Sequence, residues 1–130
     1  DWGHARDYVE GMWRIVQHGS AEDWVLATGR TTSVRHFVEL AFAEVGRQLS
    51  WTGEGVNETG IDAAAGQVLV AIDPRYFRPT EVDLLLGDPS KAAKALNWKP
   101  KVTFKALAEM MIKTDWEMAK RERLLKEHGH

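Results

Sequence analysis

The chain has 130 residues, of which 44% are hydrophobic, and its formal net charge is −2. This length fits one domain with its own core. The near balance of charges argues against a general affinity for nucleic acid or for a membrane surface. The sequence has no cysteine, which excludes disulfides and thiolate zinc sites and suits a reducing compartment.

No apolar run approaches the ~20 residues that a membrane span needs, so we expect no such span. The first residues, Asp1 to His4, already have the character of sequence from the middle of a domain. We therefore expect the chain to be a piece of a longer protein.

The first predicted element is a helix that ends near Gln17. Val9, Met12, Trp13 and Val16 recur at helical spacing and predict one buried face. His4 lies near the start of this helix, three residues before Asp7. An acid–base pair is one interpretation, but capping or packing is more typical of a histidine there.

An α/β unit is predicted next. Residues 24–28 form a short apolar run that Gly29 stops, which indicates a buried strand. Ser33 is a suitable N-cap for a helix over residues 34–45 that closes at Gly46. Arg35 falls in the first turn of this helix, where a cation opposes the helix dipole and invites an anionic partner. A ligand phosphate and ordinary surface charge both fit Arg35.

The stretch after this helix is predicted to hold two strands separated by a long loop. Residues 49–51 form a possible short strand, and residues 67–72 form a second one. Residues 53–66 are polar and rich in glycine, which indicates a surface loop. The glycines in this loop do not match a dinucleotide-binding fingerprint, and its acidic residues do not match a calcium loop, so we predict no metal site.

Two further helices are predicted near the end of the chain. Asp88 as N-cap and Pro89 at the first helical position begin a short helix that runs to Leu96. A long amphipathic helix then covers residues 104 to about 127. Its predicted inner stripe consists of Leu107, Met110, Met111, Asp115, Met118 and Leu125.

The candidate binding segment is residues 73–83, which lies between the apolar runs 68–72 and 84–86. Pro79 disfavours helical backbone at Arg78, so we expect Arg78 on a stiff, extended segment between buried runs. A guanidinium held in this way suits bidentate recognition of phosphate or carboxylate, because its N–H donors form a planar fork. Glu81 could accept hydrogen bonds from the same ligand. A surface pair between Arg78 and Glu81, or with their neighbours, remains the alternative.

Four motifs in this order (residues 1–10, 73–83, 87–91 and 96–100) closely resemble the C-terminal portion of the GDP-mannose 4,6-dehydratases. These are extended short-chain dehydrogenases/reductases that act on nucleotide sugars. The resemblance covers essentially the whole chain. It implies an α/β fold made of the end of a Rossmann-like sheet and a small substrate-binding domain. Residues 1–130 would be the C-terminal substrate-binding portion, with the N-terminal NADP-binding Rossmann part absent.

The resemblance also implies an activity, that of a hydro-lyase. In this family a tightly held NADP oxidises the sugar at C4, water leaves across C5–C6, and the hydride returns to C6. The product, GDP-4-keto-6-deoxy-mannose, is a precursor of GDP-fucose. The implied partner is GDP-mannose, and the implied intact enzyme is a cytoplasmic homo-oligomer with no nucleic-acid or membrane partner.

Carried over by position, the family pattern implies that Arg78 holds the diphosphate and Glu81 the nucleoside side of the ligand. Arg35, the third candidate for the ligand site, matches some bacterial-type members of the family but not all of its relatives. The chain lacks the family's Tyr-x-x-x-Lys couple, because Met12 stands four residues after Tyr8 and Thr80 stands four residues after Tyr76.

We therefore expect no catalytic residue in these 130 residues and no activity from the piece alone. Two alternatives remain open. One is another nucleotide-sugar enzyme of the same superfamily, a 4-reductase or an epimerase. The other is a non-catalytic interaction module, for which the long C-terminal helix is the argument.

Overall fold

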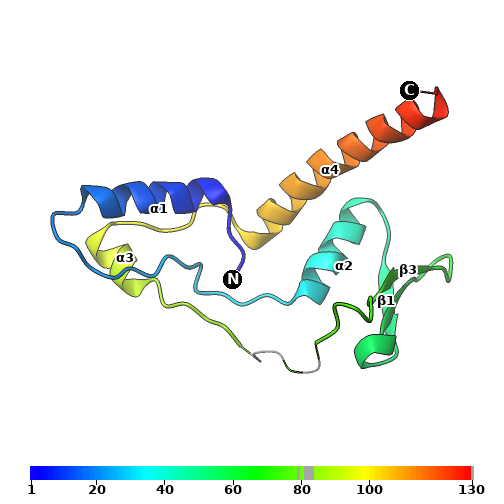
Figure 1. The fold of residues 1–130 in the computed structure, drawn as a ribbon, viewed down its shortest axis with the longest axis horizontal. Helices are drawn as coiled ribbons and strands as arrows, with labels where there is room; N and C mark the ends of the chain where they lie inside the picture. Colours follow the sequence, from blue (N-terminus) through cyan, green and yellow to red (C-terminus); the bar gives the residue numbers. More distant parts are fainter. Residues whose placement is uncertain (79, 81–83, 130) are drawn as a thin grey trace. The chain divides into compact units, whose positions relative to one another are not determined.

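The computed structural model describes residues 1–78, 80 and 84–129. The chain divides into two compact units (Figure 1). Unit 1 is Asp1–Ser33 with Leu84–His130, and unit 2 is Val34–Asp83. Unit 2 is thus inserted into the sequence of unit 1. It contains the candidate binding segment and Arg35, which the sequence places 43 residues before Arg78.

Helix α1 of unit 1 spans Ala5–Gln17, and it ends at the predicted residue. His4 is its N-cap, and the His4 Nδ1 accepts a hydrogen bond from the backbone N–H of Arg6 at 3.1 Å. The capping interpretation of His4 is therefore confirmed. This bond satisfies one of the backbone donors that the first turn of a helix leaves unpaired.

The predicted buried face of α1 is wrong. Val9, Met12, Trp13 and Val16 are 58% to 77% exposed. The opposite face packs inward, because Gly11 has no side chain and lets the helix approach Leu26 and Trp98 closely. The helix has apolar residues on more than one side, and the core of unit 1 covers only the side that carries Gly11.

The core of unit 1 forms around Trp98, which is 1% exposed. Trp98 follows α3 (Ser90–Ala95), whose Ala92 is also fully buried. The rings of Tyr8 and Trp98 lie 5.8 Å apart between centroids. Further partly buried side chains pack against this cluster: Ile15, Trp24 and Leu26.

Helix α3 begins slightly later than predicted. Pro89 occupies the N-cap position, and Asp88 Oδ1 accepts a hydrogen bond from the Ser90 N–H at 2.9 Å. The predicted N-cap, Asp88, is therefore one residue too early, although its side chain still accepts from the first backbone N–H of the helix.

The strand predicted over residues 24–28 is not observed, because these residues lie outside every helix and strand. The expected burial is observed in part. Ala27 is buried, and Trp24 and Leu26 pack against the core cluster. An apolar run of this length indicates burial, but a strand also needs a neighbour for its backbone hydrogen bonds.

Helix α4 spans Phe104–Glu127, as predicted. The Thr103 side chain caps it by accepting from the Ala106 N–H at 3.2 Å. Its predicted inner stripe is mostly wrong. Leu107 and Ala108 are buried, but the described residues from Lys113 onward are all exposed. The exposed members of that stripe are Met110, Met111, Asp115, Met118 and Leu125.

Unit 2 begins with α2 (Val34–Glu44). Gly46 follows the helix with a φ of +76°, a left-handed conformation that turns the chain. A three-stranded antiparallel sheet follows, in the order β1-β2-β3. Strand β1 is Leu49–Thr52, β2 is Thr59–Asp62 and β3 is Val68–Ala71. The register pairs Leu49 with Asp62 and Thr59 with Ala71.

The central strand β2 corrects the prediction of a surface loop over residues 53–66. This stretch also contains the short 3-10 helix η1 (Gly55–Asn57). Gly60 lies in β2, where a Cβ would come within 3.1 Å of Val70 Cβ and 3.2 Å of Trp51 Cζ3. A glycine is present because the neighbouring side chains fill the space beside the strand. Glycine was therefore a misleading loop signal here.

The chain is a mixed α/β structure, as expected. The parallel sheet of a Rossmann fold is not represented among the described residues, whose strands are all antiparallel. None of the helices described in residues 1–78, 80 and 84–129 is long and apolar enough to cross a membrane.

Candidate functional site

Arg35 is fixed in place by two contacts within unit 2. Its Nη2 donates to Glu58 Oε1 in an ion pair, and its Cζ lies 5.1 Å from the centre of the Trp51 ring. The Arg35 side chain nevertheless remains 51% exposed. The guanidinium is thus held by a carboxylate and an aromatic ring and is still open to solvent.

Trp51 is itself fixed from the same helix. Its indole Nε1–H donates to Glu39 Oε1 at 2.9 Å. Glu39 lies four residues after Arg35, on the same side of α2. Strand β1 is therefore tied to α2 by two side-chain contacts, one through Arg35 and one through Glu39.

Glu58 lies at the C-terminal end of the short helix η1. Its backbone N–H donates to Gly55 O at 3.2 Å. A Cβ placed on Gly55 would lie 3.7 Å from Phe77 Cζ, so the Phe77 ring reaches η1. The η1 turn therefore lies against Phe77, the residue before Arg78, and leads into Glu58, the partner of Arg35.

The segment that carries Arg78 begins with a turn. The Tyr76 N–H donates to Asp73 O at 3.0 Å, and Arg75 Nη2 lies 2.8 Å from Asp73 Oδ2. The hydrogen bonds from Arg75 hold the pKa of Asp73 below its usual value, and Asp73 in turn raises the pKa of Arg75. Arg75 is therefore occupied by a carboxylate two residues away.

Arg78 is exposed, which leaves it accessible to a ligand. Glu81 and Pro79 lie outside the described residues. The expectation that buried runs flank the segment is wrong for Val68 and residues 84–86, which are exposed. The roles of Arg78 and Glu81 in binding stay predictions, and the structure shows Arg35 and Arg78 within the same unit.

A second charged pair in unit 2 is structural. Asp62 is buried, and its Oδ1 accepts from the Ala64 and Ala65 N–H groups at 2.9 and 3.2 Å. Arg47 Nη1 reaches its Oδ2 at 2.5 Å. The backbone hydrogen bonds, and then the contact with Arg47, lower the pKa of Asp62. Asp62 thus stabilises the turn between β2 and β3, a role that an Asp followed by small residues indicates.

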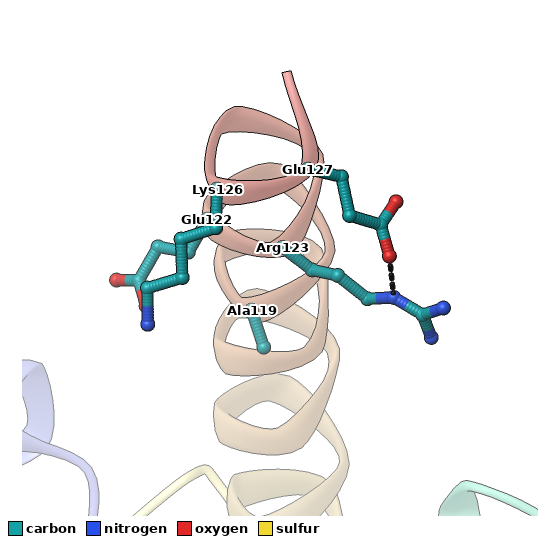
Figure 2. A pocket seen from close by; sticks show the side chains of 5 residues that line it. All are labelled: Ala119, Glu122, Arg123, Lys126 and Glu127. Carbon is teal, nitrogen blue, oxygen red and sulfur yellow. Dashed lines mark hydrogen bonds and ion pairs between the residues drawn. The ribbon is translucent and has the colours of Figure 1, made fainter. Parts of the chain in front are cut away.

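A shallow depression on α4 is formed by side chains of one helix. Figure 2 shows Glu122 and Lys126 extending on one side, while Arg123 and Glu127 form an ion pair of 2.7 Å on the other. Ala119 lies between them. Because one exposed helix supplies every lining residue, the depression has no opposing wall that would enclose a ligand.

Comparison with known proteins places the chain in a family. A family model described as GDP-mannose 4,6 dehydratase matches residues 1–111. The chain belongs to the GDP-mannose 4,6-dehydratase family. It is 58% identical over 115 residues to the GDP-mannose 4,6-dehydratase of Sinorhizobium fredii (strain HH103), which covers 88% of this chain and 33% of that protein.

Animal members of the GDP-mannose 4,6-dehydratase family are also similar. The Drosophila melanogaster protein is 55% identical over 121 residues, covering 93% of this chain and 31% of its own length. The human protein is 49% identical over 118 residues, covering 91% of this chain and 32% of its own length. The chain therefore spans about a third of the length of these relatives. The family consists of extended short-chain dehydrogenases/reductases, which agrees with the mixed α/β fold.

The NADP-binding motifs named for the family are not found within these 130 residues. The sequence has neither the glycine-rich loop nor the Tyr-x-x-x-Lys couple. Tyr8 has a raised pKa, because burial and the nearby Asp7 disfavour its ionised form, and its hydroxyl donates to Asp1 Oδ1 at 3.3 Å. The described residues also contain no group of three or more potential metal ligands.

Proposed function

We propose that this chain is the substrate-binding portion of a GDP-mannose 4,6-dehydratase, and that unit 2 binds the GDP moiety. The intact protein would convert GDP-mannose to GDP-4-keto-6-deoxy-mannose. The names of the three relatives described above favour dehydration over reduction or epimerisation. NADP, the hydride carrier of the reaction, would be held by a part of the protein outside these 130 residues.

The observation that supports a GDP site most directly is Arg35, whose guanidinium is held by Glu58 and Trp51 while its side chain is half exposed. A diphosphate is a compact anion, and an arginine offers it a planar fork of N–H donors. Arg78 follows Phe77, whose ring reaches the same η1 turn. Two arginines of one unit would thus bind the diphosphate, and Glu81 would accept hydrogen bonds from the nucleoside.

Titration of the intact protein with GDP tests this site. Arg78→Ala and Arg35→Ala should each weaken GDP binding by about tenfold or more, because each removes a charge-assisted hydrogen bond to phosphate. Arg75→Ala is the matched control, since Arg75 lies in the same segment but pairs with Asp73. Equal losses from Arg75→Ala and Arg78→Ala would exclude a specific role for Arg78.

An activity assay tests the proposed reaction. The intact protein, supplied with GDP-mannose and NADP, should form a product with a keto group at C4 and a deoxygenated C6. A product that keeps its C6 hydroxyl would contradict the proposal and favour an epimerase.

A further inference from the structure

We propose that Glu58 and Trp51 are positioning residues, which hold the Arg35 guanidinium ready to receive the diphosphate of the ligand. This inference rests on the proposed function and extends it to two residues that do not themselves contact the ligand. Arg35 has two contacts that bear on it, the ion pair with Glu58 and the cation–π contact with the Trp51 ring.

The two contacts restrict the conformation of the Arg35 side chain. A free arginine side chain has many rotamers, and binding a ligand through it costs the entropy of selecting one of them. The ion pair fixes the end of the Arg35 side chain, and the Trp51 ring limits how its plane can turn. Arg35 is thus ordered before a ligand arrives, so this entropic cost falls on folding and not on binding.

Arg35 has more hydrogen-bond donors than its contact with Glu58 uses. A guanidinium carries five N–H groups, and one oxygen of Glu58 accepts from one nitrogen, Nη2. With half of the side chain exposed, other donors remain accessible to phosphate oxygens. Glu58 therefore orients Arg35 without using up its capacity to bind an anion.

Trp51 is itself held in place by its neighbours. The ring is held on one side by the hydrogen bond to Glu39. On another side it lies against Gly60, where a Cβ would approach Trp51 Cζ3 to 3.2 Å. A strand, a helix and a glycine thus maintain a fixed aromatic surface under Arg35. An ordinary surface ion pair does not require such support and contributes little to stability.

The test combines GDP titration with steady-state kinetics on the intact protein. Glu58→Ala should weaken GDP binding and raise the KM for GDP-mannose, each about fivefold to tenfold. The kcat should stay within about twofold, because the diphosphate is bound equally in the ground state and the transition state. Glu58→Gln keeps an acceptor for Arg35 and should recover part of the affinity. Glu54→Ala is the control, because the Glu54 side chain makes no capping hydrogen bond to η1 and should leave GDP affinity unchanged.

A double-mutant cycle separates positioning from a general effect on folding. In a protein that already carries Arg35→Ala, the further change Glu58→Ala should have no effect on GDP affinity. Equal effects in both backgrounds would overturn the proposal, as would tighter GDP binding by Glu58→Ala, which would indicate competition between Glu58 and phosphate. If Glu58→Ala fails to fold, Glu58→Gln serves in the same cycle.

The outcome for the wild-type protein distinguishes the two proposals. Binding of GDP without formation of a 4-keto product would overturn the proposed reaction, while the cycle on GDP affinity would still decide the role of Glu58. A normal dehydratase whose GDP affinity is insensitive to Glu58→Ala would overturn the positioning role alone. Absence of GDP binding would overturn both.

Discussion

The indole N–H of Trp98 donates to the main-chain carbonyl of Asp7 at 2.7 Å, across 91 residues of sequence. The carboxylate of the same aspartate accepts from the backbone N–H groups of Lys101 and Val102 at 2.8 and 2.9 Å. Asp7 is only 3% exposed. Asp7, in the first turn of α1, thus holds the connection between α3 and α4 through two groups, its main-chain carbonyl and its side-chain carboxylate.

Asp7→Ala should lower the free energy of unfolding by about 2–4 kcal/mol, because it leaves two partly buried backbone donors without an acceptor. Urea denaturation followed by tryptophan fluorescence measures the change. Asp115→Ala, on the exposed part of α4, should change stability by less than about 0.5 kcal/mol. Similar losses from the two variants would show that the Asp7 hydrogen bonds do not stabilise the fold.

Gly11→Ala should destabilise the protein although alanine is the better helix former by about 1 kcal/mol. The new methyl would come within 2.6 Å of Leu26 Cδ1 and 2.9 Å of Trp98 Nε1. Overpacking of this kind typically costs about 1–3 kcal/mol. Thermal unfolding should show a lower Tm than that of Gly19→Ala, whose Cβ would have no atom within 4 Å. An unchanged Tm in Gly11→Ala would mean that α1 can move away from the core without cost.

Trp13→Glu and Val16→Glu should leave the stability of the 130-residue chain within about 0.5 kcal/mol, because both side chains are largely exposed. They should also increase its solubility, since each removes part of a contiguous apolar surface. Denaturant melts and solubility at matched concentration provide the two readouts. A large loss of stability would indicate that this face is buried in solution.

The Glu22 carboxyl should titrate far below its usual range. Its hydrogen bond to Lys91, with Nζ and Oε2 2.9 Å apart, and a second one from Ser20 lower its pKa from 4.5 to about 2. A depressed folded-state pKa stabilises the fold above the unfolded value, and this contribution is lost as the pH falls from about 4.5 to about 2.

Lys91→Met should bring the pKa of Glu22 back toward its ordinary value, which carbon-detected NMR titration of the carboxyl can follow. Lys94→Met, on the same short helix, should not, because Lys94 is not among the groups that lower the pKa of Glu22. An equal rise in both variants would point to the net charge of α3, and not to the contact with Lys91, as the cause.

Helices were the elements best predicted from sequence, because their signals are local. The helical spacing of residues 104–127, the glycine at Gly46 and the end of α1 at Gln17 depend on residues close together in sequence, and these bounds were predicted to within one or two residues. The partners of those helices were not predictable in the same way. The sequence of α1 has more than one apolar side, and only the packing against Leu26 and Trp98 shows which one the core covers.

The candidate site was predicted only in part for a related reason. Arg35 could be singled out from its position in the first turn of α2, and Arg78 from the proline that follows it. The contacts of Arg35 could not be predicted, because Trp51 and Glu58 come from different elements. Glu58 lies within residues 53–66, for which the glycine content predicts a loop. Glycine is common in loops, and the close approach that makes Gly60 necessary in β2 depends on the neighbouring strands.

Helix α4 has two parts with different sources of stability. Its 24 residues span about 36 Å, but its buried residues, Leu107 and Ala108, belong to its first two turns. Beyond Lys113 the helix is stabilised by its own backbone hydrogen bonds and by pairs such as Lys120 with Glu117. Local opening of this part breaks no core contact, so its amide protons should exchange with solvent orders of magnitude faster than those of the first two turns.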